Sequence, residues 1–445
     1  MINQILDKIR NKNIAILGFG REGKSTYKFI KEYLPEQEIT IIDQKDFEID
    51  DSKVTKVVGD GYLDNLDQYD LIIKTPGISL KDIDISSFKD RITSQLELLL
   101  EVNRMNIIGI TGTKGKSTTS SLIYEILKDQ LGDVYLLGNI GTPVLDNIDN
   151  YNENTKLVIE MSSHQLEFIK VSPHIAIILN LFQDHLDHAG SLEHYHQNKM
   201  NIFKYQDEKD YCIYSSDNDY LRERMSEYDY KGIKYTIRFD DLEKDGNYTR
   251  IVDKDIYIND QFVFHDEKRN IIGDHNLKNI MFALTVCKIL DLDMEDAKIV
   301  IEEFNGLKYR MEYIGKYHDI KFYNDTIATI PDATISAVKA IGDVDTLIIG
   351  GMDRGIDYTG FIKFLNNCKV SNIICMPTTG NIIGKELETN KNIIYVETLK
   401  EAYDEAIKCT KKDMSCLLSP AAASYEYFKN FEEKGAAFEE IVKKN

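Results

Sequence analysis

The chain has 445 residues, of which 42% are hydrophobic and 29% charged, and its formal net charge at pH 7 is −20. This length exceeds one ordinary domain core, so we expect two or three domains. The negative charge disfavours nucleic acid and anionic membranes as partners, and no run of about 18 apolar residues could span a bilayer. The six cysteines stand singly and residues 1–10 lack a signal pattern, which is typical of a cytoplasmic protein.

Short apolar runs followed by glycine-containing turns and helical patterns recur along the chain. This alternation is typical of βαβ units in parallel sheets. The strands expected in chain order are 13–17, 38–42 and 70–74, then 106–110, 134–137, 157–161 and 175–180, and finally 320–323, 346–349, 372–376, 392–396 and 416–418. Three series of strands predict three α/β domains, at 1–102, 103–306 and 307–445. Residues 211–264 alternate less regularly and predict a mixed strand excursion of the middle domain.

The first glycine cluster, Gly18-Phe19-Gly20-Arg21-Glu22-Gly23, follows the first expected strand and precedes a helical pattern. Asp43 ends the next strand. This is the spacing of a dinucleotide fingerprint, in which glycines let the backbone approach a pyrophosphate and the carboxylate accepts ribose hydroxyls. The cluster predicts a Rossmann-like domain with a nucleotide-like ligand, and a tight turn without any ligand is the alternative.

The second cluster, Thr111-Gly112-Thr113-Lys114-Gly115-Lys116-Ser117-Thr118, lies between the strand 106–110 and a helical stretch over 119–128. The strict phosphate-loop pattern would need a glycine where this chain has Ile110. The two glycines still form a loop whose N–H groups can surround phosphates. Lys116 is placed to reach the β- and γ-phosphates of a nucleotide, and Ser117 to ligate Mg²⁺. The middle domain is therefore predicted to be a P-loop ATPase with a parallel sheet.

Glu160 ends the apolar strand 157–161, after the phosphate loop. Because Mg²⁺ takes one or two carboxylates together with phosphate oxygens, Glu160 is a candidate metal ligand. A surface or capping carboxylate is the alternative interpretation.

Four of the nine histidines fall between His185 and His196. The segment contains neither a thiolate nor a His-Glu-x-x-His helix, so a zinc site is not expected. We interpret most of these histidines as parts of a solvated loop and His185 alone as a ligand.

Residues 273–279 form an expected turn leading into a helix over 279–290. In the last domain, polar motifs follow apolar strands, where open α/β sheets place their ligands. These motifs are 323–329, 350–355 and Ser419-Pro420.

Taken in order, these motifs resemble the Mur ligase family, and most of all its glutamate-adding branch. The resemblance covers essentially the whole chain. The segments that carry it are 111–118, 138–141, 160–165, 184–187, 195–199, 273–279, 309–310, 324–325, 418–424 and 428–431. It implies a Rossmann-like N-terminal domain that binds a UDP-sugar, a central ATPase domain and a Rossmann-like C-terminal domain that brings the amino acid.

The implied reaction adds glutamate, D-glutamate in most members of this branch, to UDP-N-acetylmuramoyl-L-alanine. ATP phosphorylates the alanine carboxylate, and the glutamate amine then displaces phosphate. The implied setting is peptidoglycan precursor synthesis in the cytoplasm, by a monomer.

The resemblance also implies a role for individual residues. The implied catalytic residues are Lys116, Glu160, His185 and Lys199. Ser117 and Glu160 would hold one Mg²⁺, and His185 with a carbamylated Lys199 a second. The implied ATP contacts are Gly112, Thr113, Lys114, Gly115, Lys116, Ser117, Thr118, Asn279, Arg310 and Asp325. The implied substrate contacts are Arg21, Glu22, Asp43, Asn139, Ser162, Gln165, Thr329, Arg354, Ser424 and Phe431.

The chain departs from the family pattern at Ile327, where members of this branch commonly have lysine, and at Arg354, near where some use lysine. Ile327 puts the glutamate enantiomer in doubt, because a related branch adds L-glutamate. Two rival interpretations are a folylpolyglutamate synthase and, from another class, a nicotinamide-dependent oxidoreductase or nucleotide-sensing regulatory protein. The N-terminal Rossmann-like domain and the Ser-Pro-Ala ending argue against the first, and the phosphate loop at 111–118 against the second.

Overall fold

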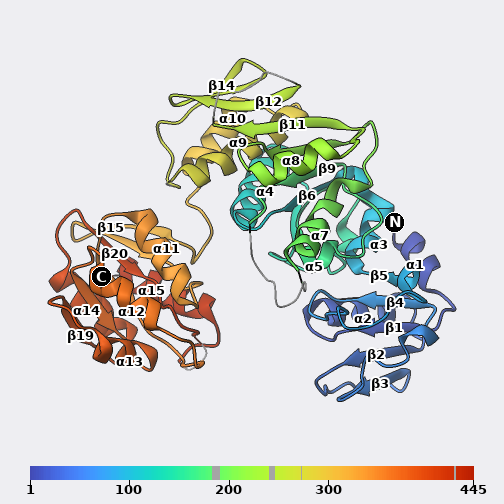
Figure 1. Ribbon diagram of the computed structural model, residues 1–445, viewed down its shortest axis with the longest axis horizontal. Coiled ribbons are helices and arrows are strands. Elements are labelled where there is room, and N and C mark those ends of the chain that lie inside the picture. Colours follow the sequence, from blue (N-terminus) through green and yellow to red (C-terminus); the bar gives the residue numbers. More distant parts are fainter. Residues whose placement is uncertain (183–190, 240–245, 272, 425–426, 445) are drawn as a thin grey trace. The chain divides into compact units, whose positions relative to one another are not determined.

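The computed structural model describes residues 1–182, 191–239, 246–271, 273–424 and 427–444 (Figure 1). By its internal contacts the chain divides into two compact units, one of Met1–Glu267 with His275–Ile301 and one of Lys268–Asp274 with Glu302–Asn445. The described residues form three sheets of five, nine and six strands. No helix among them combines the length and the hydropathy that a membrane span needs.

The N-terminal sheet is parallel throughout and has the order β3-β2-β1-β4-β5. Its strands are β1 (Ile14–Leu17), β2 (Ile39–Asp43), β3 (Val54–Val58), β4 (Leu71–Lys74) and β5 (Ile92–Thr93). The helices around it are α1 (Ile2–Ile9), α2 (Arg21–Tyr33), α3 (Gln95–Asn103), η1 (Leu66–Gln68), η2 (Lys89–Arg91) and η3 (Arg104–Asn106). All four residues of β1 are buried, as expected for a central parallel strand covered on both faces.

The middle sheet has the order β14-β13-β12-β11-β10-β9-β6-β8-β7. Its parallel part contains β6 (Ile107–Thr111), β7 (Val134–Gly138), β8 (Lys156–Glu160), β9 (Ile175–Ile178), β10 (Tyr211–Ser215), β11 (Ile233–Arg238) and β12 (Asn247–Val252). The antiparallel strands β13 (Asp255–Ile258) and β14 (Gln261–His265) complete it. Its helices are α4 (Lys116–Leu131), η4 (Ile148–Asn150), α5 (Ser163–Leu166), α7 (Leu192–Lys204), α8 (Asp219–Glu227), α9 (Asp274–Ile289) and α10 (Met294–Glu303).

The C-terminal sheet has the order β15-β16-β20-β17-β18-β19, with only the β15–β16 pair antiparallel. Its strands are β15 (Glu312–Tyr317), β16 (Ile320–Asn324), β17 (Val344–Ile349), β18 (Asn372–Cys375), β19 (Asn392–Tyr395) and β20 (Ser415–Leu418). Its helices are α11 (Pro331–Ile341), α12 (Thr359–Asn367), α13 (Thr379–Glu386), α14 (Leu399–Cys409) and α15 (Phe431–Lys444). Two apolar clusters form its core, and β17, β18 and β20 contribute to both.

The predicted α/β class is confirmed, and every strand expected from the sequence is present. The mixed strand excursion is confirmed as β10 to β14, which include an antiparallel edge. The predicted start of the helix at 279 is wrong, because α9 already begins at Asp274. The boundaries near residues 102 and 306 stay predictions.

Candidate active site

The turn between β6 and α4 forms the predicted phosphate loop. Gly112 has φ +151° and Gly115 has φ +86°, both in a region that L side chains rarely adopt. Gly115 is the N-cap of α4, and as a glycine it has no side chain that could accept from the first N–H groups of this helix. These donors and the helix dipole favour an anion at this position. The predicted phosphate contacts 112–118 therefore lie where a strand ends and a helix begins.

Two lysines meet at one carbonyl of this loop. Lys116 Nζ donates to Gly112 O at 2.9 Å and to Thr113 O at 3.2 Å. Lys199 Nζ, from α7, donates to the same Gly112 O at 3.0 Å. The Lys199 side chain is buried and also lies 4.7 Å from the centre of the Tyr195 ring. Two predicted catalytic residues that are far apart in the sequence are thus brought together, and they concentrate positive charge beside the loop.

Asn180, which the sequence analysis did not select, organises the same loop. Its Oδ1 accepts hydrogen bonds from the backbone N of Thr113 at 3.1 Å and of Lys114 at 2.9 Å, and its Nδ2 donates to Lys114 O at 3.0 Å. Asn180 follows β9, the neighbour of β6, so its position comes from strand pairing. An asparagine just beyond a buried strand was the one available signal.

Asn279 of α9 also packs against the loop, as its predicted ATP contact requires. Its Oδ1 accepts a hydrogen bond from Thr119 Oγ1 at 3.1 Å. A Cβ atom on Gly115 would lie 2.9 Å from the same Oδ1, so the close approach depends on glycine. Contact of Asn279 with ATP itself stays a prediction.

Glu160, at the end of β8, has one carboxylate oxygen bonded and one without a partner among the described residues. Oε1 accepts a hydrogen bond from Asn139 Nδ2 at 2.6 Å. The side chain is 1% exposed, and among the described residues no donor reaches Oε2. A buried carboxylate oxygen without a partner is costly, and a hard cation would satisfy it. Glu160 therefore fits the predicted magnesium role, with the hydroxyl of the half-buried Ser117 as an oxygen ligand of the kind that Mg²⁺ accepts.

The predicted ligand His185 lies outside the described residues. Within them, no group of three or more His, Cys, Asp or Glu residues could hold a metal ion. The interpretation of the histidines as parts of a solvated loop is wrong for His196, which is buried on α7 and has Nε2 3.3 Å from Phe182 O. Burial, opposed in part by the Phe182 carbonyl, lowers the pKa of His196.

The first glycine turn is packed against its own domain. A Cβ atom on Gly18 would lie 2.1 Å from Thr75 Oγ1, and one on Gly23 would lie 2.0 Å from Gly18 O. Asp43 accepts hydrogen bonds from the backbone N of Phe19 at 2.7 Å and of Lys45 at 2.9 Å. The Asp43 carboxylate thus fixes the turn, and its predicted contact with a ribose stays a prediction.

The start of α2 contacts β7 and α5 through two predicted substrate residues. Arg21 Nη2 donates to Gly138 O at 2.9 Å, next to Asn139. Gln165 Nε2 donates to Glu22 Oε1 at 2.7 Å. Burial raises the pKa of Glu22, although the hydrogen bond from Gln165 opposes the shift.

Ser162 completes this group as the N-cap of α5. Its side chain accepts from Gln165 N at 3.2 Å, and the Gln165 side chain accepts from Ser162 N at 2.9 Å. Five predicted substrate residues therefore meet where the first two sheets adjoin. Substrate contact itself stays a prediction.

Lys74 is a charged residue of this region that the sequence analysis missed. It ends β4, is 4% exposed, and lies 3.4 Å from Glu167 Oε2. Lys74, Glu22 and Gln165 line one small cavity. Burial lowers the pKa of Lys74, and the nearby carboxylates of Glu167 and Glu22 oppose that shift. A lysine at the end of the buried strand Leu71–Lys74 was the available signal.

In the C-terminal unit, Asp325 is buried in a network of hydroxyl groups. It accepts hydrogen bonds from Ser419 Oγ at 2.6 Å and Met311 N at 3.1 Å, and Ser419 Oγ also lies 2.8 Å from Thr334 Oγ1. Burial raises the pKa of Asp325 to about 7, and the charge of the exposed Arg310 opposes the shift. The predicted ATP contacts Arg310 and Asp325 are therefore neighbours.

The predicted amino-acid contacts are Thr329, Arg354, Ser424 and Phe431. Thr329 is half-buried before α11, and Arg354 is exposed after β17. Ser424 is 4% exposed, and no described residue bonds its Oγ. Phe431 begins α15, with its ring centre 6.4 Å from that of Tyr309. Whether these four contact an amino acid stays a prediction.

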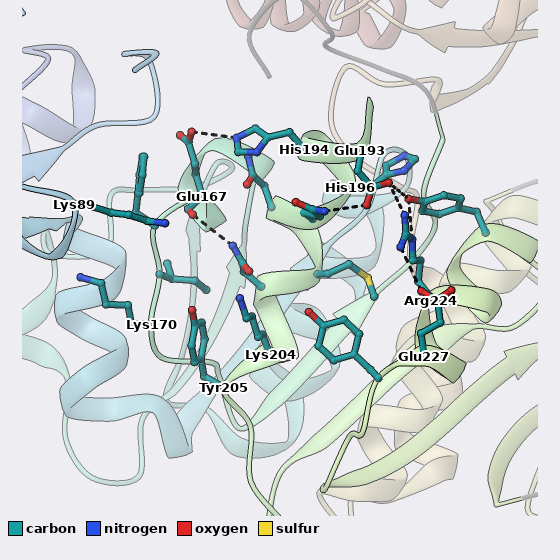
Figure 2. A pocket seen from close by; sticks show the side chains of 18 of the residues that line it. Lys89, Glu167, Lys170, Glu193, His194, His196, Lys204, Tyr205, Arg224 and Glu227 are labelled. Atoms are coloured by element: carbon teal, nitrogen blue, oxygen red, sulfur yellow. Dashed lines mark hydrogen bonds and ion pairs between the residues drawn. The ribbon is translucent and has the colours of Figure 1, made fainter. Parts of the chain in front are cut away.

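A larger groove of about 780 Å³ lies beside α7 and α8, and none of the predicted site residues lines it (Figure 2). Arg224 there bonds Glu193 at 2.5 Å and Glu227 at 3.3 Å. Glu167 faces His194 across 3.5 Å. These carboxylates have cationic or histidine partners, although no described residue forms a hydrogen bond with Glu167 Oε2 or with His196 Nδ1, which also lines the groove.

Comparison with known proteins finds a match of residues 110–287 to the Mur ligase middle domain. The UDP-N-acetylmuramoylalanine–D-glutamate ligase of Acetivibrio thermocellus is 33% identical over 99% of this chain and 98% of its own length. The protein of the same name from Caldicellulosiruptor bescii is 32% identical over 98% of each chain.

Solved structures share the fold at lower identity. The MurF ligase from Thermotoga maritima in complex with ADP has a TM-score of 0.55 and 17% identity, covering 100% of this chain and 97% of its own. The UDP-N-acetylmuramate–alanine ligase MurC from the same organism has a TM-score of 0.54 and 19% identity, covering 97% and 99%.

Proposed function

The chain belongs to the Mur ligase family, and we propose that it joins D-glutamate to UDP-N-acetylmuramoyl-L-alanine with ATP as the energy source. The predicted family and reaction type, an ATP-dependent ligase that forms an amide bond in peptidoglycan precursor synthesis, are confirmed by its relatives. The choice of these two substrates rests on the names of relatives that match this chain along nearly its whole length. Because ATP is the phosphate donor, the reaction would take place in the cytoplasm.

The observation that carries the proposal is the position of Lys116 at the phosphate loop. Lys116 donates to Gly112 O at 2.9 Å beside the glycine N-cap of α4, and Lys199, the residue proposed below to be carbamylated, reaches the same carbonyl at 3.0 Å. In the proposed reaction the alanine carboxylate attacks the γ-phosphorus, and ADP leaves with the electrons of the broken P–O bond. The backbone N–H groups and Lys116 would stabilise the negative charge that spreads over the phosphoryl oxygens.

The second step forms the amide bond. The amine of glutamate attacks the carbonyl carbon of the acyl phosphate, loses a proton, and expels inorganic phosphate. The expelled phosphate carries one oxygen that came from the carboxylate. Arg354, Ser424 and Phe431 are proposed to hold glutamate for this attack.

We propose Mg²⁺ as a cofactor on the unsatisfied Oε2 of Glu160, with Ser117 as a companion ligand. When bound, the ion would neutralise phosphate charge. A second Mg²⁺ on His185 and Lys199 is proposed from the family resemblance.

Carbamylation of Lys199 is proposed with it, because a carbamate would replace a buried cation by the oxygen ligand that Mg²⁺ prefers. Intact-mass measurement at saturating bicarbonate, compared with a Lys199→Ala variant, tests this modification directly. An unmodified Lys199 in a fully active preparation would contradict it.

The substrate assignment is tested by measuring ADP release with UDP-N-acetylmuramoyl-L-alanine and each glutamate enantiomer. The proposal expects turnover that requires the UDP-sugar peptide and D-glutamate together. Turnover with L-glutamate but not with D-glutamate would mean that the chain adds L-glutamate, the enantiomer that Ile327 leaves open. Tight NAD(H) binding with no affinity for UDP-sugars would refute the proposal.

A further inference from the structure

Lys434 is a buried cation that no step of the proposed reaction uses. It lies in the first turn of α15 and is 2% exposed. Its Nζ donates to Gly350 O at 2.8 Å, and among the described residues it forms no ion pair with a carboxylate. Burial lowers its pKa to about 8. A buried ammonium group without a counter-charge is costly for stability, so its presence at this position requires an explanation.

The carbonyl that Lys434 binds belongs to a tightly fixed loop after β17. Gly350 has φ +121°, and a Cβ atom there would lie 2.2 Å from Met376 O. Its N donates to Pro420 O at 2.9 Å. Two residues on, Met352 N donates to Ala423 O at 2.8 Å. The Gly350 loop is thus held on one side by the segment 420–423 and on the other by α15 through Lys434.

This arrangement joins three segments that carry predicted amino-acid contacts. Arg354 follows the Gly350 loop, Ser424 follows Ala423, and Phe431 lies one turn before Lys434 on α15. The buried Ser424 Oγ, which no described residue bonds, marks an unfilled hydrogen-bonding position on the second segment. The first turn of α15 is fixed in addition by Asn324 Nδ2, which donates to Gly435 O at 3.0 Å.

We propose that Lys434 is a positioning residue for the amino-acid substrate. By holding Gly350 O it fixes the loop of Arg354 against the segments of Ser424 and Phe431, so that the three act together on one anionic amino acid. Its charge, placed where little water screens it, also favours a substrate with carboxylate groups. This inference rests on the proposed function, since it concerns the glutamate step of that reaction.

A purely structural anchor would behave differently. If Lys434 served only to attach α15, its loss would lower the melting temperature and weaken all substrates alike. A positioning role predicts the opposite combination. Replacing an uncompensated buried cation with an apolar side chain of similar length should leave stability unchanged or higher, while glutamate binding alone is weakened.

The test compares Lys434→Met with Lys434→Arg and with Lys443→Met, whose lysine is exposed on the same helix and pairs with Glu439. For Lys434→Met we expect the KM for glutamate to rise about 10- to 100-fold, the loss typical of a hydrogen bond made by a charged group. The KM values for ATP and for the UDP-sugar should stay within about twofold of the wild-type values, because Lys434 is assigned no part in binding either of them. Lys434→Arg should retain most of the activity, and Lys443→Met all of it.

If the wild type is active and Lys434→Met has an unchanged KM for glutamate, this inference is wrong while the proposed function still stands. A lowered melting temperature with equal changes for all substrates would also overturn it. If the wild type releases no ADP in response to glutamate, the proposed function fails first. Should Lys434→Met not fold, Lys434→Leu, which also removes the donor to Gly350 O and the charge, carries the same measurement.

Discussion

The two glycine-rich turns of this protein have similar sequence patterns and different surroundings. In the turn before α2, the carboxylate of Asp43 binds the backbone N of Phe19, and Gly23 is packed against Gly18 O. In the turn before α4, two lysine ammonium groups bind Gly112 O, and the neutral amide of Asn180 accepts from the backbone N of Thr113 and Lys114. Both helices begin at a glycine N-cap, so the difference lies in charge: a carboxylate binds the first turn, and two cations lie beside the second. Glycine spacing alone therefore predicts a tight turn, and the charges around it decide whether it suits a phosphate.

The largest expected effect is on the second turn. Lys116→Ala should lower ADP release by at least about 1,000-fold, because the cation that faces the transferred phosphoryl group is lost. Steady-state ADP release checks this, with circular dichroism to show that the variant is folded. Lys128→Ala, an exposed lysine near the end of the same helix, serves as the control. If Lys116→Ala keeps activity within tenfold of wild type, the turn before α4 is not distinguished from the first turn by a lysine that acts on phosphate.

Glu160→Gln separates the charge of this residue from its structural hydrogen bond. The amide oxygen can still accept from Asn139, which binds Oε1 at 2.6 Å, whereas the negative charge is lost. We expect kcat to fall by about 100-fold and the Mg²⁺ concentration needed for half-maximal activity to rise. Titration of activity with Mg²⁺ after EDTA treatment checks both. If the Mg²⁺ concentration needed for half-maximal activity is unchanged, Glu160 has only a structural role.

The first turn is tested by two matched substitutions. A Cβ atom on Gly23 would lie 2.0 Å from Gly18 O, whereas one on Gly20 would meet nothing within 4 Å. Gly23→Ala should destabilise the protein by about 1–3 kcal/mol, and Gly20→Ala by less than about 0.5 kcal/mol. Thermal unfolding of both variants measures the difference. Equal melting temperatures would show that the turn is not tightly packed.

The smallest effect concerns pH. Burial raises the pKa of Glu22 above its ordinary 4.5, so the folded protein holds this proton more tightly than the unfolded chain. The stability contributed by Glu22 is therefore complete below pH 4.5 and is lost as pH rises through the folded pKa. Relative to Glu22→Gln, the wild type should lose a few degrees of melting temperature over this rise. A difference in melting temperature between the two proteins that is the same at all pH values would contradict the raised pKa of Glu22 and its burial.

Hydrophobic periodicity locates the buried strands but not two strands at the edges of the N-terminal sheet. The edge strand β3 has only half-buried and exposed residues, and β5 has only two residues, so neither stands out as an apolar run. The start of α9 was placed too late because Asp274, His275 and Asn276 are weak helix formers.

Site residues defined by a local motif could be predicted, and those defined by strand pairing could not. The loop lysine Lys116 follows from the glycine spacing around it. Asn180 lies 67 residues from Thr113, and Lys74 meets Glu167 only because two sheets adjoin. No pattern in one sequence reports such neighbours, and Lys199 was found through the family resemblance rather than from its surroundings.

We propose that the loop 111–118 directs the γ-phosphate of ATP to a carboxylate. The most direct test uses UDP-N-acetylmuramoyl-L-alanine with ¹⁸O at both oxygens of the alanine carboxylate, together with ATP and D-glutamate, and analyses the phosphate by mass spectrometry. Each phosphate released should carry one ¹⁸O atom, because one carboxylate oxygen leaves with the phosphoryl group and the other stays in the amide. Phosphate without ¹⁸O, formed at the rate of amide synthesis, would contradict it.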